Sequence, residues 1–377
     1  MKFVLAPDSF KECMTAPEAV EAMAAGIYRV YPDAQCVGLP MADGGEGTMD
    51  CLVRSTQGRV VECRVTGPMG EPVTAAYGVL EDEKTVVIEV ACCCGLSLIA
   101  GEKREPAVTT SYGVGELIRR ALDDGWRRFI VGLGGSGTND GGAGMLSALG
   151  VRFMDVKGGI LPPGGGALER LAVADFSGLD SRLAEAAFEI ASDVSNPLTG
   201  ETGASRVFGP QKGASPEKAL WLDNCLKRYA DVLHRQGWDV ESVPGAGAAG
   251  GLGAAFLLLG GKMTRGVELV LTYTGYEKKL KGADIVFTGE GSVDDQTLYG
   301  KTPCGVAVPA ARRGIPVVVF AGRVGGEPAD LAAVGIREVR CITPAGQPLK
   351  EALRSGARNL TDAVEVFLRE SAANEAE

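Results

Sequence analysis

The sequence predicts an α/β protein with two domains, and three observations support this. Near both ends of the chain, short apolar runs alternate with stretches of helical spacing, which is typical of a parallel sheet covered by helices. In the middle, alternating runs at 60–65 and 73–79 flank a glycine-proline turn and predict an antiparallel hairpin. The 377 residues also exceed what one hydrophobic core usually supports. We therefore expect a Rossmann- or flavodoxin-like parallel-sheet domain with a second, mixed α/β domain inserted into it.

The N-terminal segment predicts a strand, a loop and a helix. Residues 2–6 are an apolar run typical of a buried strand, and the loop 7–11 follows. Thr15 and Glu18 have the spacing of a capping box, in which each side chain bonds the other residue's backbone amide at a helix start. Apolar residues then recur at helical spacing. Residues 35–39 predict a second strand, which ends in a glycine- and acid-rich segment before another helix.

The C-terminal segment repeats this alternation. The apolar run 284–287 predicts a buried strand that ends in a loop of glycines and carboxylates. An amphipathic helix is expected from about 349 to 370, and residues 371–377 are expected to fray. Further strands are predicted at 86–90, 129–131, 188–191, 316–321 and 339–342, and a helix at 305–312. We expect the first domain to comprise residues 1–63 plus 281–377 and the inserted domain residues 64–280, with the site in the cleft between them.

Composition excludes several classes of protein. The formal net charge of −10 argues against a surface for nucleic acid or anionic membranes. The longest strongly apolar segment, 251–261, is too short for a bilayer, which takes about 20 residues. The ten cysteines form no CxxC pair and are too sparse for a disulfide scaffold, which predicts a cytoplasmic protein. The single histidine, His234, lies in a helical stretch and is expected to be solvated. The sequence does not indicate the oligomeric state.

The excess of glycine points to ligand-binding loops. Glycine accounts for 54 of the 377 residues, roughly double its usual share of about 7%. Residues 132–142 follow a predicted strand and match G-x-G-x-x-G, the pattern of dinucleotide loops. The polar residues Ser136, Thr138, Asn139 and Asp140 favour phosphate oxygens or a metal over mere tight packing. A second match at 245–250 follows a poor strand and predicts packing glycines.

Carboxylates follow several of the predicted strands. In an open α/β sheet, ligands bind at the carboxyl ends of the strands, so acidic residues there are candidate ligands. The segment 288–302 contains three carboxylates, and its Gly300-Lys301-Thr302 end is like a P-loop, but Asp295 stands where that pattern requires glycine. The acidic residues at strand ends are Asp43, Glu46, Asp193, Glu290, Asp294 and Asp295.

In their order along the chain, these loops resemble the type 1 glycerate kinase family of bacteria. The resemblance covers nearly the whole chain and depends on segments 8–11, 40–48, 134–142, 193–198, 208–213, 245–253 and 288–301. It implies ATP-dependent phosphorylation of D-glycerate with magnesium, with 2-phosphoglycerate as the favoured product. The sequence departs from the family at Glu12-Cys13-Met14, where small residues are usual, and at Gly137, where alanine is commoner. The first departure adds a carboxylate beside Lys11.

With this resemblance in view, we expect direct in-line transfer without a phosphoenzyme, because such transfer needs alignment and charge neutralisation more than covalent chemistry. Asp193 is expected to be the base, with Asp294 as the alternative, and Lys11 and Lys301 to offset phosphate charge. The expected phosphate-binding residues are Gly134, Gly135, Ser136, Thr138, Asn139 and Lys301. The expected magnesium ligands are Asp43, Glu290 and Asp294, and the expected glycerate contacts are Asp8, Ser9, Asn196 and Lys212.

Two other classes of function stay open at this point. A nicotinamide-dependent dehydrogenase would use the loop 132–137, but it needs an acidic ribose anchor about 20 residues further on, where Asp155 is the nearest fit. A sensor without catalysis would bind the nucleotide and the acid and show no turnover.

Overall fold

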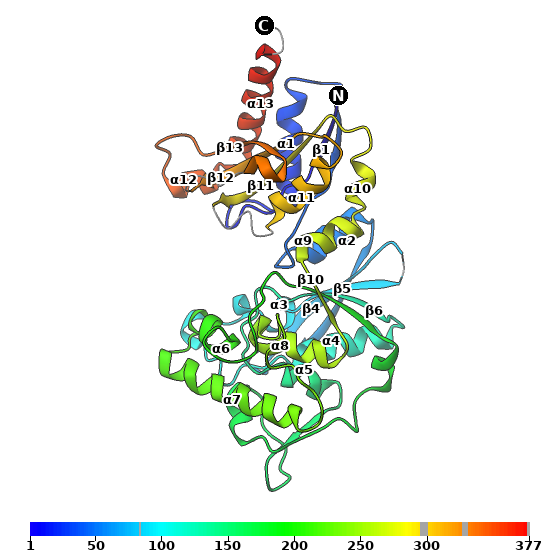
Figure 1. Ribbon diagram of the computed structural model, residues 1–377, viewed down its shortest axis with the longest axis vertical. Helices are drawn as coiled ribbons and strands as arrows, with labels where there is room; N and C mark the ends of the chain where they lie inside the picture. The colour runs from blue at the N-terminus through cyan, green and yellow to red at the C-terminus, as the bar shows by residue number, and fades with distance from the viewer. Residues whose placement is uncertain (83, 295–300, 326–330, 375–377) are drawn as a thin grey trace. The chain divides into compact units, whose positions relative to one another are not determined.

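The computed structural model describes residues 1–82, 84–294, 301–325 and 331–374 (Figure 1). The chain forms two compact units. Unit 1 comprises Met1–Asp43, Asp50–Thr56 and Val267–Glu377, and unit 2 comprises Gly44–Met49 and Gln57–Gly266. Unit 2 is thus inserted, along the chain, between parts of unit 1. Within the described residues, no helix combines the length and the apolar character that a membrane span requires.

Unit 1 contains a five-stranded parallel sheet, which confirms the predicted fold class. The spatial order is β2-β1-β11-β12-β13. Every neighbouring pair is parallel. This is the flavodoxin-like order, in which the chain runs from β1 to β2 and then crosses to the other side of β1 to form β11. The ligand crevice is therefore expected between the carboxyl ends of β1 and β11. The strands are β1 (Lys2–Leu5), β2 (Gln35–Gly38), β11 (Ile285–Val293), β12 (Val317–Val324) and β13 (Ile336–Cys341).

Aromatic side chains fill the core of unit 1. Phe287 of β11 lies 5.5 Å from Phe3 and 5.2 Å from Phe320, measured between ring centroids. Phe367 of α13 meets Phe287 edge-on at 5.7 Å. Such pairs add about 0.5–1.5 kcal/mol each beyond the burial of apolar area. The helices that lie wholly or mainly in unit 1 are α1 (Ala16–Tyr28), α2 (Thr48–Ser55), α9 (Gly266–Tyr273), α10 (Tyr276–Lys279), α11 (Thr302–Ala311), α12 (Leu349–Arg354) and α13 (Gly356–Asn374).

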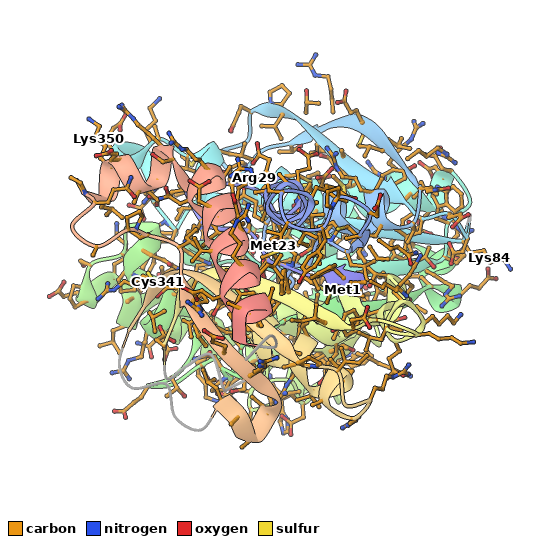
Figure 2. The ribbon with its side chains drawn as sticks, turned by 90° about the horizontal axis from the view of Figure 1, so that it is seen from above. Met1, Met23, Arg29, Lys84, Cys341 and Lys350 are labelled. Carbon is orange, nitrogen blue, oxygen red and sulfur yellow. The ribbon has the colours of Figure 1, made fainter. Side chains whose placement is uncertain are left out.

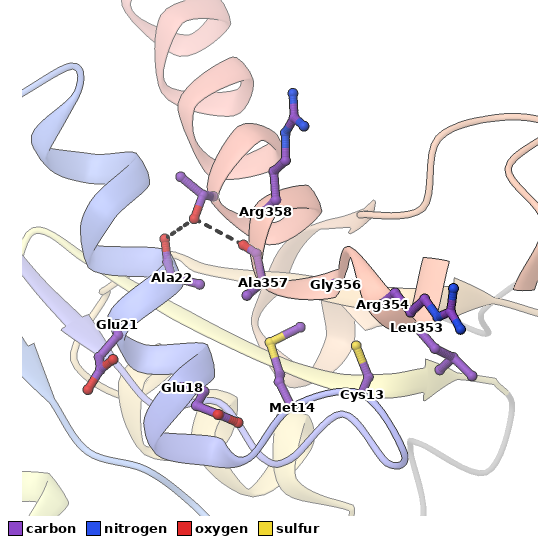
Figure 3. A pocket seen from close by; sticks show the side chains of 11 residues that line it. Cys13, Met14, Glu18, Glu21, Ala22, Leu353, Arg354, Gly356, Ala357 and Arg358 are labelled. Carbon is purple, nitrogen blue, oxygen red and sulfur yellow. Dashed lines mark hydrogen bonds between the residues drawn. The ribbon is translucent and has the colours of Figure 1, made fainter. Parts of the chain in front are cut away.

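Helix α1 begins at the predicted capping box. The Thr15 hydroxyl accepts a bond from the Glu18 amide, and the Glu18 carboxylate accepts one from the Thr15 amide. α1 then lies beside α13, where the Thr361 hydroxyl donates to the Ala22 carbonyl at 2.9 Å (Figure 3). Arg29, the C-cap residue of α1, is labelled in Figure 2. Its guanidinium pairs with Asp362 and Glu365 of α13. These exposed pairs contribute little, so the buried contacts hold the two helices together.

The expectation of one helix over 349–370 was wrong, because the structure breaks it at Ser355. The residue that opens α13 is Gly356, and a Cβ there would lie 2.0 Å from the Cys13 sulfur (Figure 3). The Phe10–Met14 turn therefore packs into the break, and periodicity alone does not show a contact with a distant turn. Helix α13 also continues to Asn374, so residues 371–374, which were expected to fray, are helical.

Strand β11 is longer than expected. The apolar run predicts an end at Phe287, but β11 continues to Val293 and stays paired with β12 as far as Val324. Gly289 in this extension packs so closely that a Cβ would meet the Phe320 carbonyl oxygen at 2.3 Å. The glycines look like a loop in the sequence, but here they allow close packing in a strand. Glu290 therefore lies on a strand rather than in a loop.

Unit 2 contains a six-stranded mixed sheet in the order β10-β9-β6-β5-β4-β3. The predicted hairpin is confirmed, because β3 and β4 pair antiparallel from Arg59↔Val79 to Thr66↔Pro72. Strands β5, β6, β9 and β10 are parallel to one another. The strands are β3 (Arg59–Thr66), β4 (Pro72–Val79), β5 (Thr85–Glu89), β6 (Arg128–Gly132), β9 (Ala187–Ala191) and β10 (Lys262–Thr264), with a separate pair β7 (Arg152–Met154) and β8 (Val173–Asp175).

The helices of unit 2 pack around this sheet. They are α3 (Ala91–Cys94), α4 (Tyr112–Asp123), α5 (Ala143–Ala148), α6 (Ala204–Phe208), α7 (Pro216–His234) and α8 (Ala248–Leu258). His234 is exposed in the last turn of α7, as expected. Helix α8 opens with left-handed residues, and a Cβ on Gly250 would lie 2.0 Å from the Thr138 carbonyl oxygen. The second glycine motif therefore consists of packing glycines, which confirms that prediction.

Glu12 gives a first prediction, because its backbone has φ = +61°. The left-handed region costs a residue with a Cβ roughly 1–2 kcal/mol, and glycine is free of that cost. We expect Glu12→Gly to raise the free energy of unfolding by up to about 1 kcal/mol, part of the gain being lost to the greater freedom of the unfolded chain. Denaturant unfolding followed by circular dichroism measures it.

The control is Glu102→Gly, which removes the same charge from an exposed residue with ordinary φ. We expect this variant to be neutral or less stable. A Glu12→Gly variant that loses as much stability as the control would contradict the strain at position 12.

Candidate functional site

Asp8 lies directly after β1, at the point where the sheet of unit 1 reverses its order. Its amide donates to the Gly289 carbonyl at 2.8 Å. Its carboxylate accepts bonds from the Thr302 hydroxyl at 2.6 Å and from the Ser9 amide at 2.6 Å. Burial, and then the charge of Asp43, raise the pKa of Asp8 to about 6, while the bonds from Thr302 and Ser9 oppose the rise. Unit 1 thus holds a carboxyl group that changes between its protonated and its charged form near pH 6.

The other predicted residues of unit 1 lie around the same end of its sheet. Lys301 is the N-cap residue of α11, and its ammonium lies 3.2 Å from Asp294. A Cβ on Gly291 would lie 3.4 Å from the Lys11 amide nitrogen, so the Lys11 turn runs along β11 near Glu290. Asp295, the remaining carboxylate of this predicted loop, lies outside the described residues. This end of unit 1 therefore combines carboxylates, lysines and a helix N-terminus, which suits anionic oxygens.

The described part of the chain has no preformed cage for a metal. Among the described residues, no group of three or more histidine, cysteine, aspartate or glutamate side chains is arranged to hold an ion. Magnesium usually keeps several waters and binds through one or two carboxylates plus substrate phosphates. The charge of the Asp43 carboxylate is, after burial, the second cause that raises the pKa of Asp8. Hard oxygen donors that repel one another in this way fit a magnesium ion that arrives with a nucleotide.

The loop after β6 in unit 2 has an exposed tip and a buried base. Gly135 is exposed and left-handed, with φ = +74°. The amides of Gly135 and of the neighbouring Ser136, which is buried, donate no hydrogen bond to any other group in the described part of the chain. Gly134, also at the tip, is half-buried. Successive unshared amides around a left-handed glycine form a concave site for anions.

The base of this loop is held by buried polar groups. Thr138, Asn139 and Asp140 are fully buried. The Asp140 carboxylate accepts bonds from the Ser111 amide and hydroxyl and from the amides of Gly142 and Gly144. Burial raises the pKa of Asp140, which these donors oppose. Thr138 and Asn139, predicted to contact phosphate, therefore lie behind the tip.

Asn139 is also incompletely bonded. Its side-chain nitrogen donates to the Ser205 hydroxyl at 2.8 Å, whereas its side-chain oxygen is buried without a hydrogen-bond partner in the described part of the chain. Sequence patterns alone pointed to neither Ser111 nor Ser205, because each lies far along the chain from the loop that it supports.

Asp193 lies two residues beyond the end of β9. The last residue of β9, Ala191, pairs with Gly132 at the start of the glycine loop. The Asp193 side chain is exposed, and one of its oxygens accepts a bond from the Gly266 amide at 3.1 Å. Within unit 2 the sheet therefore brings an exposed carboxylate and the tip of the glycine loop to the same edge.

The segment 44–49 lies against this edge of unit 2. The Gly134 amide donates to the Gly44 carbonyl at 3.4 Å. A Cβ on Gly44 would lie 2.9 Å from the Ala191 Cβ. The Met49 amide donates to the Glu89 carboxylate at the end of β5. Glu89 and Thr302 are further residues that the sequence prediction missed, since one reads as the end of a strand and the other as the start of a helix.

The remaining predicted residues have local partners. The Asn196 side-chain amide donates to the Thr202 carbonyl at 2.8 Å. The Lys212 ammonium is buried and donates to the Ser136 hydroxyl and to the Thr138 carbonyl. Their predicted contacts with glycerate stay predictions. Ser9, Lys11 and Asp43 are exposed.

A pocket elsewhere in unit 1 is distinct from these groups. It has a volume of about 380 Å³ and is lined by residues of α1, α12 and α13, together with Cys13 and Met14 (Figure 3). Of the predicted site residues that the structure describes, none lines it. Geometry alone therefore does not make this pocket a reaction site.

The acidic anchor that a dehydrogenase would need has another role. Asp155 follows β7, and its carboxylate accepts bonds from the amides of Lys157 and Gly159 in the turn that it begins. These bonds lower its pKa. Asp155 therefore caps a turn.

Comparison with known proteins shows the family. A sequence model described as the glycerate kinase family matches residues 3–371. A glycerate kinase of Bacillus cereus is 49% identical over 96% of this chain and 95% of its own length. A glycerate 2-kinase of Escherichia coli is 46% identical over 96% of this chain and 95% of its own length.

The solved structures agree with this. The crystal structure of a candidate glycerate kinase 2 from Salmonella typhimurium LT2 matches with a TM-score of 0.89 and 44% identity, covering 100% of both chains. This chain belongs to the glycerate kinase family, and it is therefore an enzyme, a phosphotransferase.

Proposed function

We propose that the protein transfers the γ-phosphoryl group of ATP directly to the 2-hydroxyl of D-glycerate and releases 2-phosphoglycerate and ADP. The observation that carries this proposal is the edge of unit 2, where unshared amides at the tip of a glycine loop lie after β6 and an exposed carboxylate lies after the neighbouring strand β9. Membership in the glycerate kinase family supports the acceptor, and a relative named glycerate 2-kinase supports the position of the new phosphate.

The donor side of the reaction uses the glycine loop. The amides of Gly135 and Ser136 would bind phosphate oxygens as they accumulate negative charge, and Gly134 lets the backbone approach them closely. Thr138 and Asn139 act from behind, because both are buried. Lys11 and Lys301 of unit 1 would offset the remaining phosphate charge.

The acceptor side needs a base. Asp193 would accept the proton of the glycerate hydroxyl while the oxygen forms its bond to phosphorus and the bond to the ADP oxygen breaks. An exposed carboxylate that already accepts an amide bond is held in position and remains reachable. Asp294 is the alternative base. Asp8, Ser9 and Asn196 would bind the carboxylate and the second hydroxyl of glycerate.

Magnesium would be held by Asp43, Glu290 and Asp294, directly or through water. It would supply positive charge that neutralises the phosphate oxygens during transfer.

We also propose that the protein works in the cytoplasm. All ten cysteines are free thiols in the structure, which is the state that a reducing compartment maintains.

The first test is a coupled ADP-release assay with a panel of small hydroxy acids, followed by phosphorus NMR of the product. We expect turnover with D-glycerate and a product phosphorus signal coupled to the single proton on carbon 2. Coupling to two protons would place the phosphate on the 3-hydroxyl. Binding of ATP and glycerate without ADP release would contradict the proposed activity.

The role of Asp193 gives a second prediction. Asp193→Asn keeps the shape of the side chain but removes the proton acceptor. We expect kcat to fall by about 10²- to 10⁴-fold, with a much smaller change in the KM for glycerate, because a base acts in the transition state. Steady-state kinetics with both substrates measures this.

The matched control is Asp239→Asn, which makes the same change at another exposed residue of unit 2. Its kinetics should be those of the parent protein. An Asp193→Asn enzyme with unchanged kcat would remove Asp193 from this role. A phosphorylated enzyme able to pass its phosphate to glycerate would overturn direct transfer.

A further inference from the structure

Lys212 is a charged residue inside unit 2. It ends the short 3-10 helix Pro210–Lys212, and its side chain is inside the protein, with only 2% of the residue exposed. The chain turns it inward at Gly213, which has φ = +97° and lies so close to Arg104 that a Cβ would meet the Arg104 carbonyl oxygen at 2.5 Å. A buried ammonium is costly unless its hydrogens are bonded.

Within the described part of the chain, this ammonium donates two hydrogen bonds, and both go to the glycine loop. It donates to the Ser136 hydroxyl at 3.0 Å and to the Thr138 carbonyl at 2.7 Å. Bonds from a charged donor are about twice as strong as neutral ones, and a buried position strengthens them further. Because Ser136 and Thr138 lie on either side of Gly137, the ammonium fixes two points of the loop at once.

The surroundings of Lys212 are partly charged. Two titratable groups interact electrostatically with its ammonium, Cys94 of α3 and Asp140 of the loop. Burial lowers the pKa of Lys212 to about 8, and the interactions with Cys94 and Asp140 oppose this. The lysine is therefore protonated at neutral pH and loses its proton within a few pH units above it.

We infer that Lys212 is a positioning residue for the nucleotide, acting through the glycine loop rather than by contact with glycerate. From inside the protein its ammonium holds Ser136 and Thr138, and this keeps the amides of Gly135 and Ser136 in a position to bind phosphate. The inference deepens the proposed function and rests on it for the identity of the bound phosphate. The restraint on the loop exists in the protein without substrate.

The first experiment measures the loop itself. We compare hydrogen–deuterium exchange of the protein and of Lys212→Met without ligand, at one pH. The amide of Gly137, which lies between Ser136 and Thr138 and donates to the Cys94 carbonyl at 2.8 Å, should exchange roughly tenfold faster in the variant, since two charge-assisted bonds that hold this part of the loop are lost. Amides of α4 should keep their rates. Unchanged exchange of the Gly137 amide in a folded variant would overturn the inference, and this result does not depend on activity.

The second experiment separates nucleotide from glycerate. Lys212→Met should raise the KM for ATP roughly ten- to hundredfold and leave the KM for glycerate within about twofold. The control Lys157→Met removes an exposed lysine from the β7–β8 turn and should change neither constant. A rise confined to the KM for glycerate would overturn the inference in favour of direct glycerate contact.

A milder variant covers the case in which Lys212→Met does not fold. Ser136→Ala removes one of the two acceptors and keeps the lysine. It should change loop exchange and the KM for ATP in the same direction by a smaller factor. If Ser136→Ala leaves both unchanged, the proposed restraint is absent.

The pH dependence gives a separate readout. A lysine with a lowered pKa loses its charge as pH rises through about 8, so its bonds to the loop weaken above that pH. The KM for ATP should therefore rise between pH 7 and pH 9 in the parent protein, and this rise should be missing in Lys212→Met. The same rise in both proteins would contradict the role of Lys212. A parent protein with no ATP-dependent turnover would refute the proposed function, while the exchange experiment would still decide the restraint.

Discussion

The chemistry of unit 2 depends on close packing of backbone against backbone around the 132–142 loop. A Cβ on Gly134 would lie 2.6 Å from the Gly45 Cα, and one on Gly250 would lie 2.0 Å from the Thr138 carbonyl oxygen. The residues at the base of the loop, Thr138, Asn139 and Asp140, are fully buried. The Lys212 and Asp140 charges are therefore solvated by protein groups, and the unshared amides belong to the exposed Gly135 and to the buried Ser136 beside it. Glycine thus serves two purposes: it closes the base of the loop and opens the tip.

In unit 1, the parallel sheet places charged groups near the carboxyl ends of β1 and β11. The strand order reverses between β1 and β11, and this separates the chain segments that leave the two strands. Asp8 lies on the segment that follows β1, and Glu290 lies in the C-terminal half of β11. The Thr302 hydroxyl connects the first turn of α11 to Asp8, and the Lys301 ammonium at the start of this helix pairs with Asp294. A group of this mixed charge suits a substrate that brings its own phosphates and magnesium. It also explains how a protein of net charge −10 can handle anionic substrates.

Much of the fold could be predicted because its signals are local. The capping box at Thr15 and the alternation of the hairpin each act over a few residues, and the structure confirms both. The errors have long-range causes. Strand β11 continues past Phe287 because β12 pairs with it. The expected last helix breaks at Ser355 because the distant Cys13 packs against the next residue, Gly356.

The candidate site shows the same division. Sequence spacing brought the glycine loop and the carboxylates to strand ends, but it could not show which side chains face inward. Some residues are of the types that often contact ligands but are buried, namely Thr138, Asn139 and Lys212. The unusual Gly137 also has a long-range reason, because a Cβ there would lie 2.7 Å from the Ile99 side chain.

The measurement that tests the nucleotide site most directly is a titration of the isotope-labelled protein with magnesium and a non-hydrolysable ATP analogue, followed by backbone amide NMR. Saturable shifts at Gly134, Gly135 and Ser136, larger than those at the 245–250 glycines, are the expected result. Saturation of binding with the amides of 134–136 unshifted would contradict it.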